Sequence, residues 1–209
     1  MTTQSKTKSR IVPIITLVVF LLLWETGVRS GIISAIFFPA PTKILESLVK
    51  LTKNGELFTA FSATMLRFLA GVVCGAILGA VFGLMMGWWP KLNNFLAPWM
   101  SALYPIPKIA IFPLLMIIFG IGEGSKFVAI LLAAFFPMLI ATQAGVNQIS
   151  RIYFEVAQNY GVKGKRIFTH VLLPGSMPSI MAGLKMSTNT GFVIAISVEV
   201  ISAKAGLGV

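Results

Sequence analysis

Hydrophobic positions occur in long runs along this chain, and short polar or basic segments separate the runs. A bilayer core about 30 Å thick needs about 20 mostly apolar residues per helix. Runs of that length predict five spans, at about 11–28, 61–89, 98–120, 127–146 and 180–201. A polar tail, 1–10, precedes the first span. The mixed segment 29–60 predicts a short amphipathic helix that starts near Pro41 and reaches Lys53, outside the membrane or at its interface.

The composition agrees with this pattern. Hydrophobic residues make up 56% of the 209 residues and charged residues only 11%, against roughly 25% charged residues in soluble domains. The chain is therefore predicted to be an all-α polytopic membrane protein. One cysteine and one histidine leave no disulfide framework and no cysteine-based metal site. The formal charge of +11 does not predict a nucleic-acid partner, because the basic residues follow or precede apolar runs and form no soluble basic face.

The basic residues also predict an orientation. Only Lys and Arg count in the positive-inside rule. With the N-terminus inside, the segments 1–10, 88–97 and 148–185 carry nine basic residues, namely Lys6, Lys8, Arg10, Lys91, Arg151, Lys163, Lys165, Arg166 and Lys185. The outside segments carry six, namely Arg29, Lys43, Lys50, Lys53, Lys126 and Lys204. This moderate bias predicts a cytoplasmic N-terminus and a cytoplasmic polar segment after the fourth span.

Two of the spans have unusual sequences. The span 98–120 contains Pro105, Pro107 and Pro113, which predict a bent or partly unwound helix that lines a cavity or is buried in protein. Lys108 lies in the same stretch and either faces a pathway or extends to the nearer interface. The span 61–89 has glycines at a strict four-residue spacing, which places them on one helix face and predicts close helix packing. These glycines are Gly71, Gly75, Gly79, Gly83 and Gly87.

The polar segment 151–178 lies between the fourth and fifth predicted spans. It predicts a helix from Arg151 to Tyr160, a turn at Gly161, and a second helix from Gly164 to Val171 that stops at Leu172–Pro174. Such a helix-turn-helix beneath the membrane is either a contact for a partner or an amphipathic loop held by anionic lipid. The chain has no phosphate-binding loop, paired carboxylates, HExxH motif or Ser/His/Asp arrangement, so we do not expect an enzyme, and energy for any work must come from elsewhere.

This segment resembles the EAA motif of type I ABC importer permeases. The matching positions are Glu155, Ala157, Gly161, Ile167, Leu173 and Pro174. Val156 replaces the usual second alanine, which is a mild departure. The stretches 37–45 and 104–126, the run Thr64, Arg67 and Gly71, and the glycine-rich end after Glu199 resemble the nitrate/sulfonate/taurine-type branch of this family. The resemblance covers roughly residues 20–209.

The resemblance implies the MetI-like fold and a permease domain at 61–209 that includes the coupling loop 151–178. It also implies a cytoplasmic ABC ATPase dimer that binds ATP and Mg²⁺, while this chain binds no cofactor. The other implied partners are a second copy of the permease, an extracytoplasmic solute-binding protein and membrane lipid, and the implied location is the bacterial inner membrane. Family members continue into a sixth span, so the chain is expected to lack that span.

A small oxyanion or sulfonate is the expected cargo, and fixed positive charge near the path would attract it. Arg67 and Lys108 are the candidates, with Glu199 as a candidate ion-pair partner. The alternative function is an ATP-independent channel or ion-coupled secondary transporter, for which acidic or histidine relays or an inverted repeat are expected. The sequence contains neither of these features.

Overall fold

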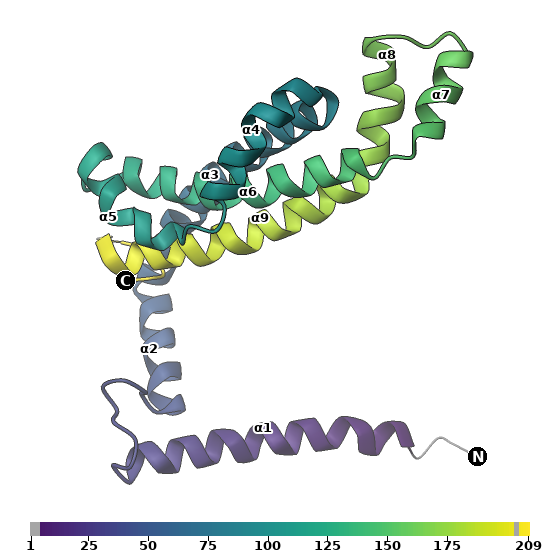
Figure 1. Cartoon of the computed structure of the whole chain (residues 1–209). Helices are drawn as coiled ribbons and strands as arrows, with labels where there is room; N and C mark the ends of the chain where they lie inside the picture. The colour runs from purple at the N-terminus through teal and green to yellow at the C-terminus, as the bar shows by residue number, and fades with distance from the viewer. Residues whose placement is uncertain (1–4, 203–204) are drawn as a thin grey trace. The chain divides into compact units, whose positions relative to one another are not determined.

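The computed structural model describes residues 5–202 and 205–209, with side chains from residue 12 onward, and this part of the chain consists of helices joined by turns (Figure 1). Residues 1–4 of the predicted tail and Lys204 of the charge count lie outside the described residues. Four described helices are long and apolar enough to cross a membrane, and a bent pair of shorter helices would add a fifth. The all-α polytopic prediction is therefore confirmed. The chain forms two compact units, Met1–Phe58 and Thr59–Val209.

The first unit contains the helices α1 (Ser5–Arg29) and α2 (Pro41–Lys53). α2 has the predicted bounds. It begins at Pro41 because the proline ring fixes φ near the helical value and a residue in the first turn needs no N–H partner. The Glu25 carboxylate of α1 accepts hydrogen bonds from the Thr42 N–H (3.1 Å) and from the Thr42 hydroxyl (2.8 Å). A side chain from α1 thus caps the start of α2, where backbone N–H groups have no partner within the helix.

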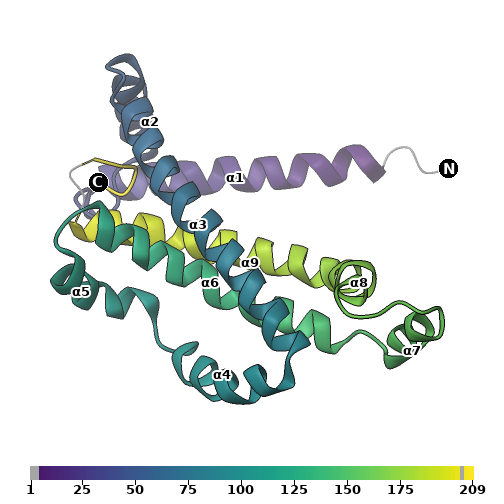
Figure 2. The ribbon, with the colours of Figure 1, turned by 90° about the horizontal axis from the view of Figure 1, so that it is seen from above.

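The core of the second unit consists of three long helices, α3 (Glu56–Trp88), α6 (Glu123–Asn147) and α9 (Leu173–Ser202). Figures 1 and 2 show α6 and α9 side by side along most of their length. One buried cluster joins residues of all three helices, namely Phe68, Val72, Ile130, Ala134 and Ala195.

The evenly spaced glycines of α3 lie against α6. A Cβ atom at Gly79 would lie 2.5 Å from the Phe135 carbonyl oxygen and 2.8 Å from the Met138 Cβ. At Gly87 it would lie 2.5 Å from the Val146 Cβ. Gly71, Gly75 and Gly83 are similarly close to α6. The backbones of the two helices therefore approach more closely than any larger residue would allow.

Small residues and hydroxyl groups join α6 to α9. The Ser187 hydroxyl donates to the Ala134 carbonyl oxygen at 2.7 Å, and the Thr190 hydroxyl donates to the Ala133 carbonyl oxygen at 2.9 Å. Gly183 packs on the same helix, since a Cβ there would lie 2.8 Å from the Ala141 Cβ. Hydrogen bonds of this kind stabilise contacts between helices in apolar surroundings.

The third predicted span consists of two helices, α4 (Pro90–Leu103) and α5 (Lys108–Phe119), which are bent by 99° where they meet. The prediction of a broken helix is confirmed, but its predicted start at 98 is wrong. Pro90 occupies the first turn, where its missing N–H costs nothing, so the helix begins there. α5 packs on α6 and α9 through the buried Phe112 and Leu115.

The polar segment forms α7 (Arg151–Asn159), α8 (Lys165–Ile167) and the π-helical turn η1 (Phe168–Leu172), which leads directly into α9. The prediction that the second short helix stops at Leu172–Pro174 is wrong. In a regular α-helix the ring of Pro174 would clash with a carbonyl group one turn earlier. The wider π-turn before Pro174 makes room for the ring, so the helix continues through the proline. The last predicted span therefore begins earlier than 180.

Candidate functional site

Two regions of the second unit carry the residues that the sequence singled out. Figure 1 shows α7 and α8 at one end of α9, and the C-terminus of the chain at the other end. A helix of 30 residues is about 45 Å long at about 1.5 Å per residue. The two regions therefore lie far enough apart to be on opposite sides of a membrane.

The turn after α7 depends on Gly161, as predicted. Gly161 has φ +79°, a conformation that favours glycine. The Gly161 N–H donates to the Gln158 carbonyl oxygen, and the Val162 N–H donates to the Ala157 carbonyl oxygen, both at 2.9 Å. This pair of bonds is a Schellman motif, which satisfies the last carbonyl groups of α7 and turns the chain back toward α8.

Five of the six motif residues of this loop fall into two groups. Glu155, Gly161 and Pro174 are exposed. Ile167 is buried, and Leu173 packs against the buried cluster of Ala76, Met138 and Ile180. The second group therefore attaches the loop to the helix bundle and leaves the first group free for a contact.

An apolar surface of α7 accompanies the exposed motif residues. Ile152, Tyr153 and Val156 are 59%, 63% and 47% exposed, and α7 has no buried residue. Tyr153, Val156 and Ala157 also line a pocket of about 790 Å³ between α7 and the start of α9. On the η1 side, the ring of Phe168 packs edge-on against Trp88 at the end of α3, with ring centres 6.1 Å apart.

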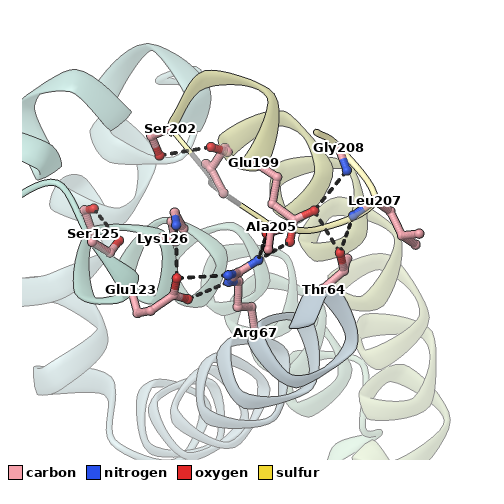
Figure 3. Close-up of polar contacts among 12 residues, drawn as sticks. Thr64, Arg67, Glu123, Ser125, Lys126, Glu199, Ser202, Ala205, Leu207 and Gly208 are labelled. Atoms are coloured by element: carbon pink, nitrogen blue, oxygen red, sulfur yellow. Dashed lines mark hydrogen bonds and ion pairs between the residues drawn. The ribbon is translucent and has the colours of Figure 1, made fainter. Parts of the chain in front are cut away.

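At the other end of α9, Arg67 joins three elements (Figure 3). Its Nε and Nη2 atoms both donate to the Glu123 carboxylate of α6, the second at 2.9 Å. Its Nη1 atom donates to Glu199 Oε1 of α9 and to the Ala205 carbonyl oxygen, each at 2.7 Å. The buried Lys126 ammonium also binds Glu123, at 3.0 Å. We call the side chains of Thr64, Arg67, Glu123, Lys126 and Glu199 the ion-pair cluster.

The Glu199 carboxylate is fully hydrogen-bonded within this cluster. It is 1% exposed, and its second oxygen accepts from the Thr64 hydroxyl at 2.8 Å and from the Gly208 N–H at 3.1 Å. A Cβ at Gly206 would collide with this carboxylate, and φ at Gly206 is +144°. Only glycine therefore lets the C-terminal segment pass this close to the buried charge.

Lys108 lies at the break between α4 and α5. Its ammonium donates to the carbonyl oxygens of Leu103 (3.0 Å), Tyr104 (2.8 Å) and Ile106 (2.9 Å). It also lies 4.4 Å from the centre of the Phe136 ring. The cation thus binds carbonyl groups at the end of α4 and in the break, where the regular hydrogen bonds of the helix stop.

Three residues were predicted as pathway candidates. Arg67 and Glu199 form an ion pair in the structure, whereas Lys108 contacts backbone carbonyl groups elsewhere. Sequence reasoning missed Glu123 and Lys126 as members of the ion-pair cluster. The sequence does contain a signal, since an acidic and a basic residue three positions apart follow a glycine turn at a helix start. Within residues 5–202 and 205–209, no group of three or more His, Cys, Asp and Glu residues is placed to hold a metal ion.

Residues 71–209 match the family model of the binding-protein-dependent transport system inner membrane component. The chain belongs to this family. The matched region holds α5, α6, α9 and the whole α7 loop, and it includes Gly161 and Glu199 of the two regions described above.

This permease also has curated relatives of similar sequence. It is 32% identical over 198 residues to the taurine transport system permease protein TauC of Escherichia coli (strain K12), covering 92% of this chain and 72% of the relative. It is 30% identical over 190 residues to SsuC of Bacillus subtilis (strain 168), a permease protein named for aliphatic sulfonate transport, covering 91% of this chain and 69% of the relative.

The predicted functional class is therefore confirmed. The chain is the permease subunit of an ABC importer, which is a transport component and not an enzyme. Membership of the family implies an ATPase and a solute-binding protein as partners and the inner membrane as the location. The alternative of a channel or ion-coupled secondary transporter gains no support from these relatives.

Proposed function

We propose that this permease carries a small sulfonate across the inner membrane and that the exposed surface of α7 binds the ATPase. The names of two relatives, for taurine and for aliphatic sulfonates, support the cargo class. ATP and Mg²⁺ bind to the ATPase and not to this chain. A second copy of the permease completes the pathway, and lipid surrounds the pair.

The apolar surface of α7 is the observation that supports a contact with the ATPase. Ile152, Tyr153 and Val156 are more than 45% exposed on a helix of nine residues, which is too short to cross a bilayer. A protein partner would remove this surface from water at about 25 cal/mol per Å² of apolar area. Glu155 lies on the same short helix, and the Gly161 turn has no side chain to obstruct a partner.

The distribution of basic residues supports one orientation of the permease in the membrane. The α7 loop and the ion-pair cluster lie at opposite ends of α9, so only one of them faces the cytoplasm. The excess of Lys and Arg in the predicted inside segments favours the α7 loop. The N-terminus of α1 then lies in the cytoplasm as well.

The three pathway candidates, Arg67, Lys108 and Glu199, have different contacts. Arg67 donates four hydrogen bonds to two carboxylates and one carbonyl group, and the cluster contains two positive and two negative side chains. We propose that Arg67 and Glu199 hold the outer ends of α3, α6 and α9 together. Lys108 contacts backbone carbonyl groups and no carboxylate of the described residues, and it is the candidate for a positive charge beside the path.

Replacing Gly161 with valine is expected to weaken ATPase binding about tenfold, because the strain of a positive φ, roughly 1–2 kcal/mol, distorts the turn. Glu155→Lys is expected to weaken binding similarly by reversing a charge at the contact. The measurement is the amount of ATPase that co-purifies with the tagged permease in detergent.

The matched control is Gly120→Val. Gly120 has φ +81° and open space around a Cβ, as Gly161 does, but it lies at the end of α5, away from α7. We expect this variant to retain the ATPase. Equal retention by Gly161→Val and Gly120→Val would rule out the α7 turn as the contact.

A further inference from the structure

A pocket of about 550 Å³ lies between the α4–α5 break and the middle of α9. Lys108 and Pro107 from the break, Pro137 from α6, and Asn189 and Val193 from α9 are among the residues that line it. Most of its surface is apolar. Broken helices line the solute path in many transporters, because irregular backbone at membrane depth needs a cavity or a protein neighbour.

Asn189 is the unusual residue of this pocket. It lies near the middle of α9 and is exposed, and its carboxamide has no hydrogen-bond partner within the described residues. The neighbouring Thr190 hydroxyl, in contrast, donates to the Ala133 carbonyl oxygen. A free amide that faces lipid costs several kcal/mol. Asn189 therefore faces water, a solute or a polar group of another chain.

Lys108 contributes a charge whose position is fixed. Three carbonyl oxygens at the end of α4 and in the break after it hold its ammonium, and the Phe136 ring lies next to it. The ammonium has only three hydrogens to donate, so it offers an anion a positive potential and no free donor. The Asn189 amide supplies the donor that Lys108 lacks.

We propose that this pocket is a transit site for the sulfonate group of the cargo, where the Asn189 amide donates to a sulfonate oxygen and Lys108 provides the positive potential. This inference rests on the proposed function. A single hydrogen bond and one charge with committed donors bind an anion weakly, which suits a site that must release its cargo in each cycle. Val193, 62% exposed, forms part of the apolar wall that would meet the carbon chain.

The test uses the permease assembled with its ATPase and solute-binding protein in liposomes, with ATP-driven uptake of radiolabelled taurine as the readout. Asn189→Leu is expected to lower the maximal uptake rate about tenfold, the effect of losing one hydrogen bond to a charged group. Basal ATP hydrolysis without taurine should fall much less than the uptake rate does. Asn189→Gln should recover part of the rate, because it keeps the amide.

Thr188→Val is the matched control. Thr188 is the residue before Asn189, but its hydroxyl donates to the Leu184 carbonyl oxygen of its own helix, and it does not line the pocket. This variant should transport taurine at the wild-type rate. Val193→Phe, which narrows the pocket, should reduce uptake of a longer alkanesulfonate more than uptake of taurine.

Three results would overturn the inference. Wild-type uptake by Asn189→Leu would show that the amide does not contact the cargo. Equal losses of uptake and of basal ATP hydrolysis would show that Asn189 contacts another chain and stabilises the assembly. Equal effects of Val193→Phe on short and long sulfonates would exclude the pocket as the route. If the wild-type complex takes up no sulfonate at all, the proposed cargo class is itself wrong.

Discussion

Alanine at both Gly75 and Gly79 is expected to prevent this permease from folding into a stable helix bundle. The new Cβ atom at Gly79 would lie 2.5 Å from the Phe135 carbonyl oxygen and 3.1 Å from the Leu139 nitrogen, and the one at Gly75 would meet the Leu131 carbonyl oxygen. These neighbours are backbone atoms of α6, so no side-chain rotation relieves the clash. Overpacking costs about 1–3 kcal/mol per site and more where backbone must move. We expect the variant to lose most monodisperse protein in detergent size-exclusion chromatography.

A matched pair of glycines provides the control. Gly122 has open space around a Cβ, with φ −171°, and a Cβ at Gly124 would lie 3.8 Å from the nearest atom, the Phe119 carbonyl oxygen. Alanine at both positions is expected to leave the elution profile and the melting temperature near the wild-type values, because neither site is close-packed. Similar profiles for the two double variants would contradict the role of the α3 glycines in packing.

Replacing Arg67 with methionine is expected to destabilise the permease by about 3–5 kcal/mol, the usual cost of removing one partner of a buried ion pair. The change leaves the Glu199 carboxylate, which is 1% exposed, without its cation. Arg67→Lys is expected to retain little of the lost stability, because one ammonium cannot reproduce hydrogen bonds to Glu123, Glu199 and the Ala205 carbonyl oxygen at once. The melting temperature of purified protein measures the effect.

The double variant Arg67→Met/Glu199→Gln separates this explanation from simple loss of packing. Removing the buried charge together with its partner should recover part of the lost stability, since no unpaired charge remains. Arg29→Met is the control for removal of an exposed ion pair. Arg29 pairs with Glu25 one helical turn away and its side chain is 69% exposed, so we expect a change of about 0–1 kcal/mol. No recovery in the double variant would contradict the explanation.

The charge balance of the ion-pair cluster also bears on transport. Arg67 and Lys126 face Glu123 and Glu199, so the four side chains carry no net charge when all are ionised. A neutral cluster attracts a sulfonate weakly at a distance. For this reason we propose Lys108 and Asn189 for the transit site and propose that the ion-pair cluster holds helices together.

Local features of the sequence were sufficient for much of the fold. The length of the apolar runs predicted the long helices, and Pro41 predicted the start of α2. The prolines near Lys108 predicted the break before α5, and Gly161 predicted the turn after α7. Each of these features acts within a few residues along the chain, through hydrophobic length, a missing N–H or a positive φ.

Two predictions about helix ends at prolines were wrong. Pro174 indicated a stop, yet the π-turn η1 before it lets the helix continue into α9. The third span was predicted to begin near 98, yet α4 begins at Pro90. In both cases the sequence pattern does not indicate whether a proline ends a helix, starts one or is accommodated within it.

The sequence by itself determined that this protein is a helical membrane permease, because apolar length and motif spacing are properties of the chain. Only the tertiary structure decided that Arg67 pairs with Glu123 and Glu199, that Lys108 binds backbone carbonyl groups, and that Asn189 faces the pocket beside the helix break. Those contacts join residues far apart in sequence, and a side chain's partner depends on which helix faces pack together.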